Sequence, residues 1–113
     1  MIRQGDIYWY DFGQPRGSEP GFHRPVVVIQ NDLANGTAIR TTIVCTVTTN
    51  LRLAAARGNV LLDAGEGNLS RRSVVNVSQV ATVDKSHLTD DSYIGSLSPQ
   101  HIADVIEGAR LFL

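Results

Sequence analysis

Metal ligands, disulfide partners and membrane-spanning segments are all scarce in this sequence. A single cysteine, Cys45, cannot form a disulfide within the chain. The three histidines are widely spaced, and neither a His-x-x-x-His nor a Cys-x-x-Cys motif occurs, so we expect no metal site. Apolar runs such as residues 26–29 are far shorter than the ~20 residues that span a bilayer. Because no apolar segment follows the amino-terminal positive charge, we expect no signal peptide and a cytoplasmic location.

Nucleotide-binding motifs and a strong net charge are also absent. Neither a Gly-x-Gly-x-x-Gly nor a Walker-type loop is present, so we expect no nucleotide cofactor. The net charge is −1, yet residues 1–83 carry eight arginines against six acids, whereas residues 84–113 carry two bases against five acids. Nine of the ten basic residues are arginine, whose planar guanidinium suits phosphate. A solvated surface with a chance bias would give the same composition, so composition alone does not identify the partner.

The pattern of β-branched and aromatic residues predicts several short strands followed by one helix. The 113 residues, 42% of them hydrophobic, are enough for one domain over residues 1–113. Ser98 is a suitable N-cap and Pro99 a suitable first residue for a helix with the apolar face Ile102, Val105, Ile106 and Ala109. Strands are predicted at residues 7–12, 25–30, 39–49, 59–62, 73–77 and 79–83. This order predicts a mainly β fold, either a small β-barrel or a two-sheet domain, with a C-terminal helix.

Two segments place polar side chains where predicted strands begin or end. Residues 13–25 contain three prolines and three glycines and are predicted to form a long loop, and Arg24 stands where this loop meets a buried strand. Its guanidinium can be held there for a ligand, or it can close the loop through a salt bridge. Further along, a buried strand runs into hydroxyl side chains, with Thr46 and Thr48 on one face and Thr49 on the other. Threonine is also a common strand residue, so both interpretations remain open.

Ordered motifs along nearly the whole chain resemble the MazF/PemK family of toxin endoribonucleases. The resemblance is weakest at residues 52–67 and after residue 93, and it is carried by residues 5–12 (Gly-Asp-Ile-Tyr-Trp-Tyr-Asp-Phe), 17–19 (Gly-Ser-Glu), 23–32, 43–49 and 72–85. It implies an SH3-like β-barrel with a C-terminal helix, the CcdB/PemK-like toxin fold, acting as a homodimer. It also implies that the toxin cleaves single-stranded mRNA without a metal or other cofactor, and that a small MazE-like antitoxin neutralises it.

The resemblance assigns site residues position by position. The family's catalytic arginine falls on Arg24 and its catalytic threonine on Thr48, with Thr49 as the alternative if the register differs by one. Pro20 follows the Gly-Ser-Glu motif where the family often has another residue, which alters the RNA contacts expected of this loop. The positions matched to RNA contact or to support of the site are Phe12, Ser18, Glu19 and Gln79.

RNA supplies its own nucleophile, the 2′-OH, so the protein has to position that group and stabilise the charge that develops on the phosphate. Arg24 can direct two N–H donors at the non-bridging oxygens, and Thr48 can donate its hydroxyl to the same phosphate. This attack would leave a 2′,3′-cyclic phosphate and a 5′-OH. An arginine is a poor general base because its pKa is above ~12, so Glu19 and His23 are the candidates for proton transfer.

A chain with almost no net charge needs a local basic surface to bind RNA. We expect four arginines to line a groove beside the site, namely Arg16, Arg24, Arg52 and Arg57. Four aromatic side chains can stack on unpaired bases or pack against the protein, namely Tyr8, Tyr10, Phe12 and Phe22. One face of the first strand must fill the core, so only some of its aromatic side chains are free to stack.

Two other functions remain open from the sequence. A noncatalytic toxin resembling CcdB would bind a protein target such as gyrase through its dimer surface, and it would not need Arg24 and Thr48. An inactive barrel would serve only as an interaction module. The joint presence of the two residues favours the nuclease. We further expect a homodimer that covers the helix face at Ile102, Val105 and Ile106, and an acidic, partly disordered antitoxin segment that binds the groove.

Overall fold

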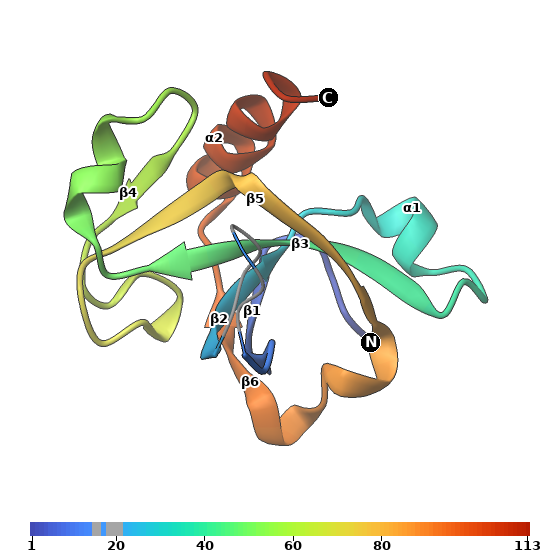
Figure 1. The fold of residues 1–113 in the computed structure, drawn as a ribbon. Coiled ribbons are helices and arrows are strands. Elements are labelled where there is room, and N and C mark those ends of the chain that lie inside the picture. Colours follow the sequence, from blue (N-terminus) through green and yellow to red (C-terminus); the bar gives the residue numbers. More distant parts are fainter. Residues whose placement is uncertain (15–16, 18–21) are drawn as a thin grey trace.

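Strands make up most of the computed structural model, which describes residues 1–14, 17 and 22–113 (Figure 1). The described strands form one antiparallel sheet in the order β4-β5-β3-β2-β1-β6. Their bounds are β1 Asp6–Asp11, β2 His23–Val28, β3 Thr41–Thr48, β4 Val60–Leu62, β5 Ser73–Asp84 and β6 Tyr93–Ser96. The described helices are α1 (Asp32–Asn35), α2 (Pro99–Arg110) and the 3₁₀ segments Leu51–Ala55, Glu66–Asn68, Lys85–His87 and Asp90–Ser92.

The mainly β class with a C-terminal helix is confirmed, and the described strands form a single curled sheet, half a barrel, rather than two sheets (Figure 1). The strands predicted at residues 73–77 and 79–83 are one strand, β5. A bulge rather than a turn lies between them, because Cys45 pairs with Val80 whereas the next residue of β3, Thr46, pairs with Asn76. Because the bulge interrupts the regular strand, the sequence pattern predicts two strands where the structure has one.

Two short elements are not predicted by the sequence pattern. β6 has four residues, of which only Ile94 is β-branched, so its sequence gives little strand signal. α1 forms where the sequence analysis predicts no helix, and the Asn31 side chain caps it by accepting the Ala34 N–H at 2.9 Å. Across the described part of the chain, no helix has the length and apolar character needed to cross a membrane.

The two faces of the sheet build separate cores, because alternate residues of a strand point to opposite faces. The first core lies between the sheet and α2 and contains Ile7, Val27, Cys45, Val47, Leu62, Leu69, Val75, Val77, Leu97, Val105 and Ala109. The second core lies on the other face and contains Ile2, Tyr8, Val26, Val28, Val44, Val83 and Leu88. Residues 26–28 are buried throughout, which confirms that this strand is covered on both faces.

The helix α2 closes the first core. Val105 is only 1% exposed, Ala109 is buried beside it, and Ile102 packs against the same core. The expectation that a second chain must cover this helix face is therefore wrong for Ile102 and Val105, which pack against the sheet of their own chain, whereas Ile106 is half-buried. A homodimer stays a prediction that rests on the family resemblance.

Two glycines let α2 approach the segment before β4 at backbone distance. A Cβ added to Gly108 would lie 2.0 Å from the carbonyl oxygen of Gly58, a distance at which two atoms cannot coexist. Gly58 has a φ of +86°, a conformation that residues with side chains rarely adopt. The contact therefore requires glycine at both positions.

The N-terminus of α2 is held by a carboxylate from outside the helix. Ser98 is the predicted N-cap and accepts the His101 N–H. His101 stands where a capping box would have Glu or Gln, and Glu66 takes that role instead, because its Oε2 accepts the Ser98 N–H at 2.7 Å. Its Oε1 lies 3.0 Å from Nδ1 of His101. The hydrogen bond from Ser98, followed by the charge of His101, lowers the pKa of Glu66.

We expect Glu66→Gln to lower the free energy of unfolding by about 1 kcal/mol near neutral pH, because the amide removes a charge-assisted hydrogen bond. The folded-state pKa of Glu66 is lowered from 4.5. Its stabilisation is therefore fully present above that value and is lost as the pH falls through the folded-state pKa. Urea denaturation of both proteins across this range should show the difference shrinking under acid, and Glu107→Gln on the exposed side of α2 is the control. An equal difference at all pH values would contradict this role.

Candidate active site

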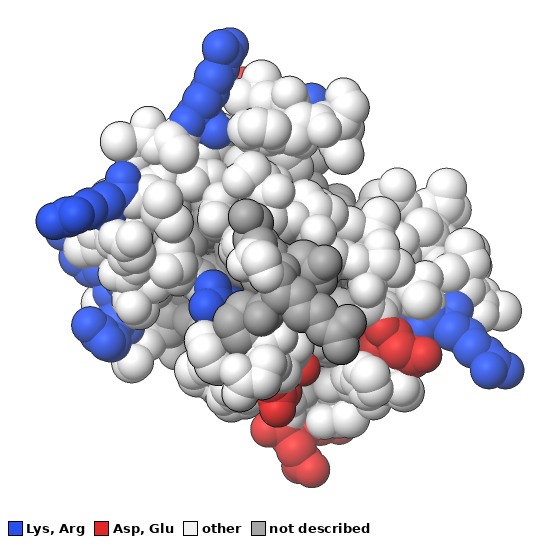
Figure 2. Space-filling view, viewed as in Figure 1, with Lys and Arg blue, Asp and Glu red and all other residues white. Residues whose placement is uncertain are grey.

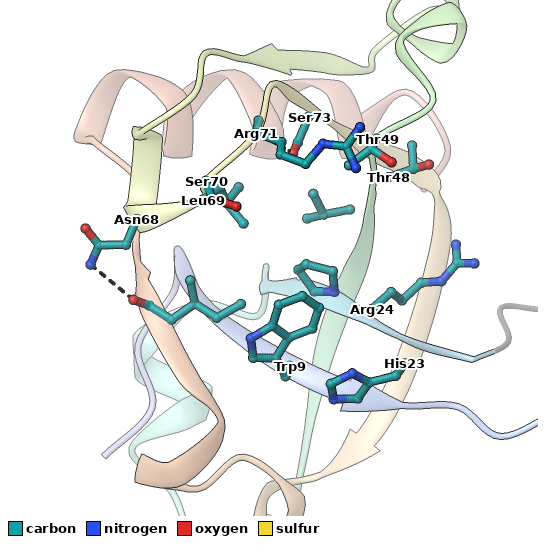
Figure 3. Close-up of a pocket in the computed structure, with 13 residues that line it drawn as sticks. Trp9, His23, Arg24, Thr48, Thr49, Asn68, Leu69, Ser70, Arg71 and Ser73 are labelled. Atoms are coloured by element: carbon teal, nitrogen blue, oxygen red, sulfur yellow. Dashed lines mark hydrogen bonds between the residues drawn. The ribbon is translucent and has the colours of Figure 1, made fainter.

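A groove of about 440 Å³ lies at the end of the sheet where β2 begins and β3 ends (Figure 3). Its volume is within the range of roughly 300–1,000 Å³ that is common for small-ligand sites. One wall comes from β1, β2 and β3, and the other from the segment that joins Glu66–Asn68 to β5. The residues that line this groove are Trp9, His23, Arg24, Pro25, Val47, Thr48, Thr49, Asn68, Leu69, Ser70, Arg71, Ser73 and Ile94.

The register of β2 and β3 brings Arg24 beside Thr48. Val26 pairs with Thr46 in this antiparallel ladder, so two residues further on Arg24 lies level with Thr48. Both side chains then point to the same face of the sheet, the face of the second core. Thr48 Oγ1 accepts the Asn50 N–H at 3.1 Å, which orients the hydroxyl and leaves its hydrogen able to donate.

The groove extends round the strand ends to the other face of the sheet. His23 alternates with Arg24 along β2, so it belongs to the face of the first core, whereas Thr49 is the residue that follows the end of β3. Thr48 and Thr49 both line the groove, and the predicted division between their faces stays a prediction. Thr48 is the threonine that shares a face with Arg24.

Gln79 lies outside the groove and contacts the strand that carries Thr48. It lies inside the pairing shift of β5, between Asn76 and Val80, and its Oε1 accepts the hydroxyl of the fully buried Thr46 at 2.7 Å. Thr46 is two residues before Thr48 on β3. The structure therefore places Gln79 where it holds β3 in position, at a distance from the groove surface.

The aromatic side chain that lines the groove is Trp9, which sequence reasoning did not single out. Its indole is 43% exposed and stacks on His23, with ring centroids 4.9 Å apart and an angle of 12° between the planes. Tyr8, in contrast, is only 6% exposed in the second core, so of the two alternatives for this ring the structure shows packing against the protein. Tyr10 and Phe12 contact each other and pack against that same core. The alternation along β1 shows two faces, but only the tertiary structure tells which of them borders the groove.

A second arginine of the groove, Arg71, was also missed. Arg52 and Arg57 do not line the groove, and Arg16 lies outside the described residues. Arg72, the sequence neighbour of Arg71, is a solvent-exposed side chain whose Nε lies 3.7 Å from Oδ1 of Asp63. Figure 2 shows most Lys and Arg side chains of this view on its left side and upper edge, apart from the acids along its lower edge.

Backbone hydrogen bonds join the two described ends of the long loop, next to β1 and β2. Phe22 has a φ of +63°, and its carbonyl oxygen and N–H bond to Phe12 and Gly13 across the loop ends. Phe22 is exposed and does not line the groove. Ser18 and Glu19, which were expected to contact RNA and to assist catalysis, lie outside the described residues.

Two ordinary candidates for nucleophile or base chemistry are held protonated. Burial raises the pKa of the Cys45 thiol to about 12, and burial together with Asp6 raises that of Tyr8 to about 12. Neither group is ionised near neutral pH. In residues 1–14, 17 and 22–113, no group of three His, Cys, Asp or Glu side chains is placed to hold a metal ion.

Comparison with known proteins gives concordant matches over the whole length of the chain. The family model described as PemK-like, MazF-like toxin of type II toxin-antitoxin system matches residues 3–113. Endoribonuclease MazF6 of Mycobacterium tuberculosis is 42% identical over 113 residues, which cover 100% of this chain and 97% of the relative. Endoribonuclease EndoA of Bacillus subtilis is 39% identical over 90 residues, or 80% of this chain and 77% of the relative.

Solved structures share the same architecture. An endoribonuclease in complex with its cognate antitoxin from Mycobacterial species has a TM-score of 0.78 at 18% identity, covering 98% of this chain and 93% of that one. MazF from Deinococcus radiodurans has a TM-score of 0.78 at 21% identity, covering 98% and 94%. These likenesses support the fold, and the sequence matches establish the family. The chain therefore belongs to the PemK-like, MazF-like family of toxins of type II toxin–antitoxin systems.

Proposed function

We propose that this chain is a sequence-specific endoribonuclease that cleaves single-stranded mRNA and thereby inhibits translation and growth. The observation that carries the proposal is the placement of Arg24 and Thr48 on one face of neighbouring strands at the mouth of a groove. Curated relatives that share 42% and 39% identity are named endoribonucleases, which supports the same activity for this chain. A noncatalytic toxin of the CcdB type would have no use for this pair.

The proposed reaction uses the substrate's own 2′-OH as the nucleophile. The 2′-oxygen bonds to phosphorus, the bond to the 5′-oxygen breaks, and the products are a 2′,3′-cyclic phosphate and a 5′-OH. Arg24 donates two N–H groups to the non-bridging oxygens, and Thr48 donates its hydroxyl to the same phosphate. Both donors are set by strand backbone, so they need little reorganisation as charge develops. The reaction requires no metal or other cofactor in this scheme.

Proton transfer falls to Glu19 or His23. His23 neighbours Arg24 on β2 and is fixed by its stack on Trp9, so its ring is held at the groove. Glu19 belongs to the loop that returns to β2 just before His23. In the proposed site, Phe12, Ser18, His23 and Thr49 contact or position the RNA, and Gln79 supports β3 through Thr46.

The proposed partners are a second copy of the chain and a small MazE-like antitoxin, all in the cytoplasm. A structural neighbour is described as an endoribonuclease in complex with its cognate antitoxin, and a second as MazE-MazF from Deinococcus radiodurans. The arginines of the groove would attract an acidic, partly disordered antitoxin segment. Such a segment would inhibit the toxin by occupying the path of the RNA.

We expect Arg24→Ala and Thr48→Val each to reduce the rate of RNA cleavage by roughly 100-fold or more, the usual cost of removing one preorganised donor to a developing anion. The change from Thr to Val keeps the shape of the side chain and removes only the hydroxyl. A fluorogenic RNA assay measures the rate, and circular dichroism checks the fold. Arg110→Gln, at an exposed position of α2, is the control. Rates like that of the wild type in either variant would refute the assignment and favour a noncatalytic toxin.

The nucleophile is tested by a substrate with a single 2′-deoxy nucleotide on the 5′ side of the cut. We expect no cleavage at that position, because the attacking oxygen is missing, and unchanged cleavage of the all-RNA substrate in EDTA. Gel analysis of end-labelled oligonucleotides resolves both outcomes. Comparable cleavage of the deoxy substrate would mean that water attacks, and loss of activity in EDTA would mean that a metal takes part.

We expect the purified chain to be a homodimer, and an acidic antitoxin peptide to compete with a non-cleavable RNA for the groove. Because the attraction is partly electrostatic, peptide affinity should fall as the salt concentration rises. Light scattering gives the stoichiometry, and fluorescence polarisation follows the competition. A monomer at micromolar concentration, or full binding of both ligands at once, would contradict this expectation.

A further inference from the structure

The Trp9 side chain has the properties of a platform for an unpaired base. Pairing of Trp9 with Pro25 places the indole diagonally across from His23, on the same face of the sheet, and the imidazole covers one side of it. Trp9 remains 43% exposed and lines the groove, so part of its side chain is accessible to a ligand (Figure 3). A flat aromatic surface that is fixed from behind suits a nucleobase and loses little conformational freedom when the base binds.

A cation faces this platform from the opposite wall. Arg71 lies in the segment between Glu66–Asn68 and β5, and it lines the same groove (Figure 3). Among the described residues, no acid forms an ion pair with Arg71, whereas its neighbour Arg72 lies against Asp63. Arg71 is thus placed to receive an anion from a ligand that occupies the groove.

The two faces of the sheet separate this pair from the proposed catalytic residues. Arg24 and Thr48 point to the face of the second core, and Trp9 shares the face of the first core with Ile7. A strand of RNA that passes over the ends of β2 and β3 would meet the two sets in succession. If the reacting phosphate lies at Arg24 and Thr48, the base of the adjacent nucleotide and the next phosphate then lie on the face of the first core.

We propose that Trp9, backed by His23, stacks on the base of a nucleotide adjacent to the scissile phosphate, and that Arg71 binds the phosphate beyond that base. The inference rests on the proposed function, because it assigns a subsite to the RNA that the chain cleaves. A paired base has no free face to stack, so this subsite selects single-stranded RNA. Trp9 and Arg71 are positioning residues in this scheme, since neither contacts the reacting atoms.

Trp9 is the sole tryptophan of the chain, so its fluorescence reports directly on the subsite. The probe is an oligoribonucleotide with one 2′-deoxy nucleotide at the cut, which binds without being cleaved. We expect it to quench the Trp9 emission, and an abasic nucleotide at one position next to the cut to abolish that quenching. Abasic substitutions elsewhere should leave the quenching intact. Binding of the probe with no change in emission at any position would overturn the stacking role.

Kinetics separate this subsite from the catalytic pair. We expect Trp9→Ala to raise KM about tenfold or more, and Trp9→Phe, which keeps a ring against His23, to restore most of the affinity and to leave kcat within about threefold of the wild type. The effects of Trp9→Ala and of the abasic nucleotide should not add, because both remove the same contact. Phe112→Ala, an exposed aromatic outside the groove, is the matched control. Full additivity at every position would overturn the proposal.

Salt dependence tests the phosphate contact. We expect Arg71→Gln to reduce the slope of log K against log salt concentration by about 0.7, the value for one phosphate contact on a single strand. Arg72→Gln is the matched control, because it removes the same charge one residue away and outside the groove. An equal change of slope in both variants, or a loss of kcat in Arg71→Gln as large as in Arg24→Ala, would overturn this role. If the wild type cleaves RNA and these variants match it, only the subsite is wrong, whereas a wild type that cleaves no RNA refutes the proposed function as well.

Discussion

The antiparallel pairing of β2 with β3 determines where chemistry can take place in this protein. Val26 opposite Thr46 fixes the pairing inside the sheet, where both residues are completely buried. Both faces of β2 are covered, so a slip by one residue would exchange the side chains that fill the two cores and disturb the packing of both. This register also sets the positions of Arg24 and Thr48, which lie level with each other on the two strands. The geometry of the proposed catalytic pair is thus specified by residues buried inside the sheet.

The bulge in β5 helps to hold β3 from the edge opposite β2. β5 pairs with β3 along both halves, and at the shift between them Gln79 reaches the hydroxyl of Thr46. A buried hydroxyl without a partner would be costly, so this hydrogen bond also secures the part of β3 nearest the site. The resemblance matches Gln79 to RNA contact or to support of the site. In the structure Gln79 supports β3, the strand that carries Thr48.

Local signals predicted much of the fold, because β-branched runs, turn residues and the Ser98–Pro99 cap act over short distances. The resemblance supplied Arg24 and Thr48, which the structure brings together. Trp9 could not be predicted in the same way, since its exposure depends on which face of β1 the rest of the chain covers. Arg71 could not be predicted either, because only the tertiary structure brings its segment to the groove. Glu66 is a further case, because its partner Ser98 is 32 residues away and no local motif joins them.

The backbone contact between Gly58 and Gly108 limits how this family member can vary. Where side chains separate two elements, a change in one can be absorbed by a new rotamer in another. Here there is no side chain to move, so the distance between α2 and the segment before β4 is set by atomic radii alone. Sequence drift elsewhere in α2 can be compensated locally, but a larger residue at either glycine has to displace the whole helix. The two glycines therefore fix the spacing between the C-terminal helix and the segment before β4.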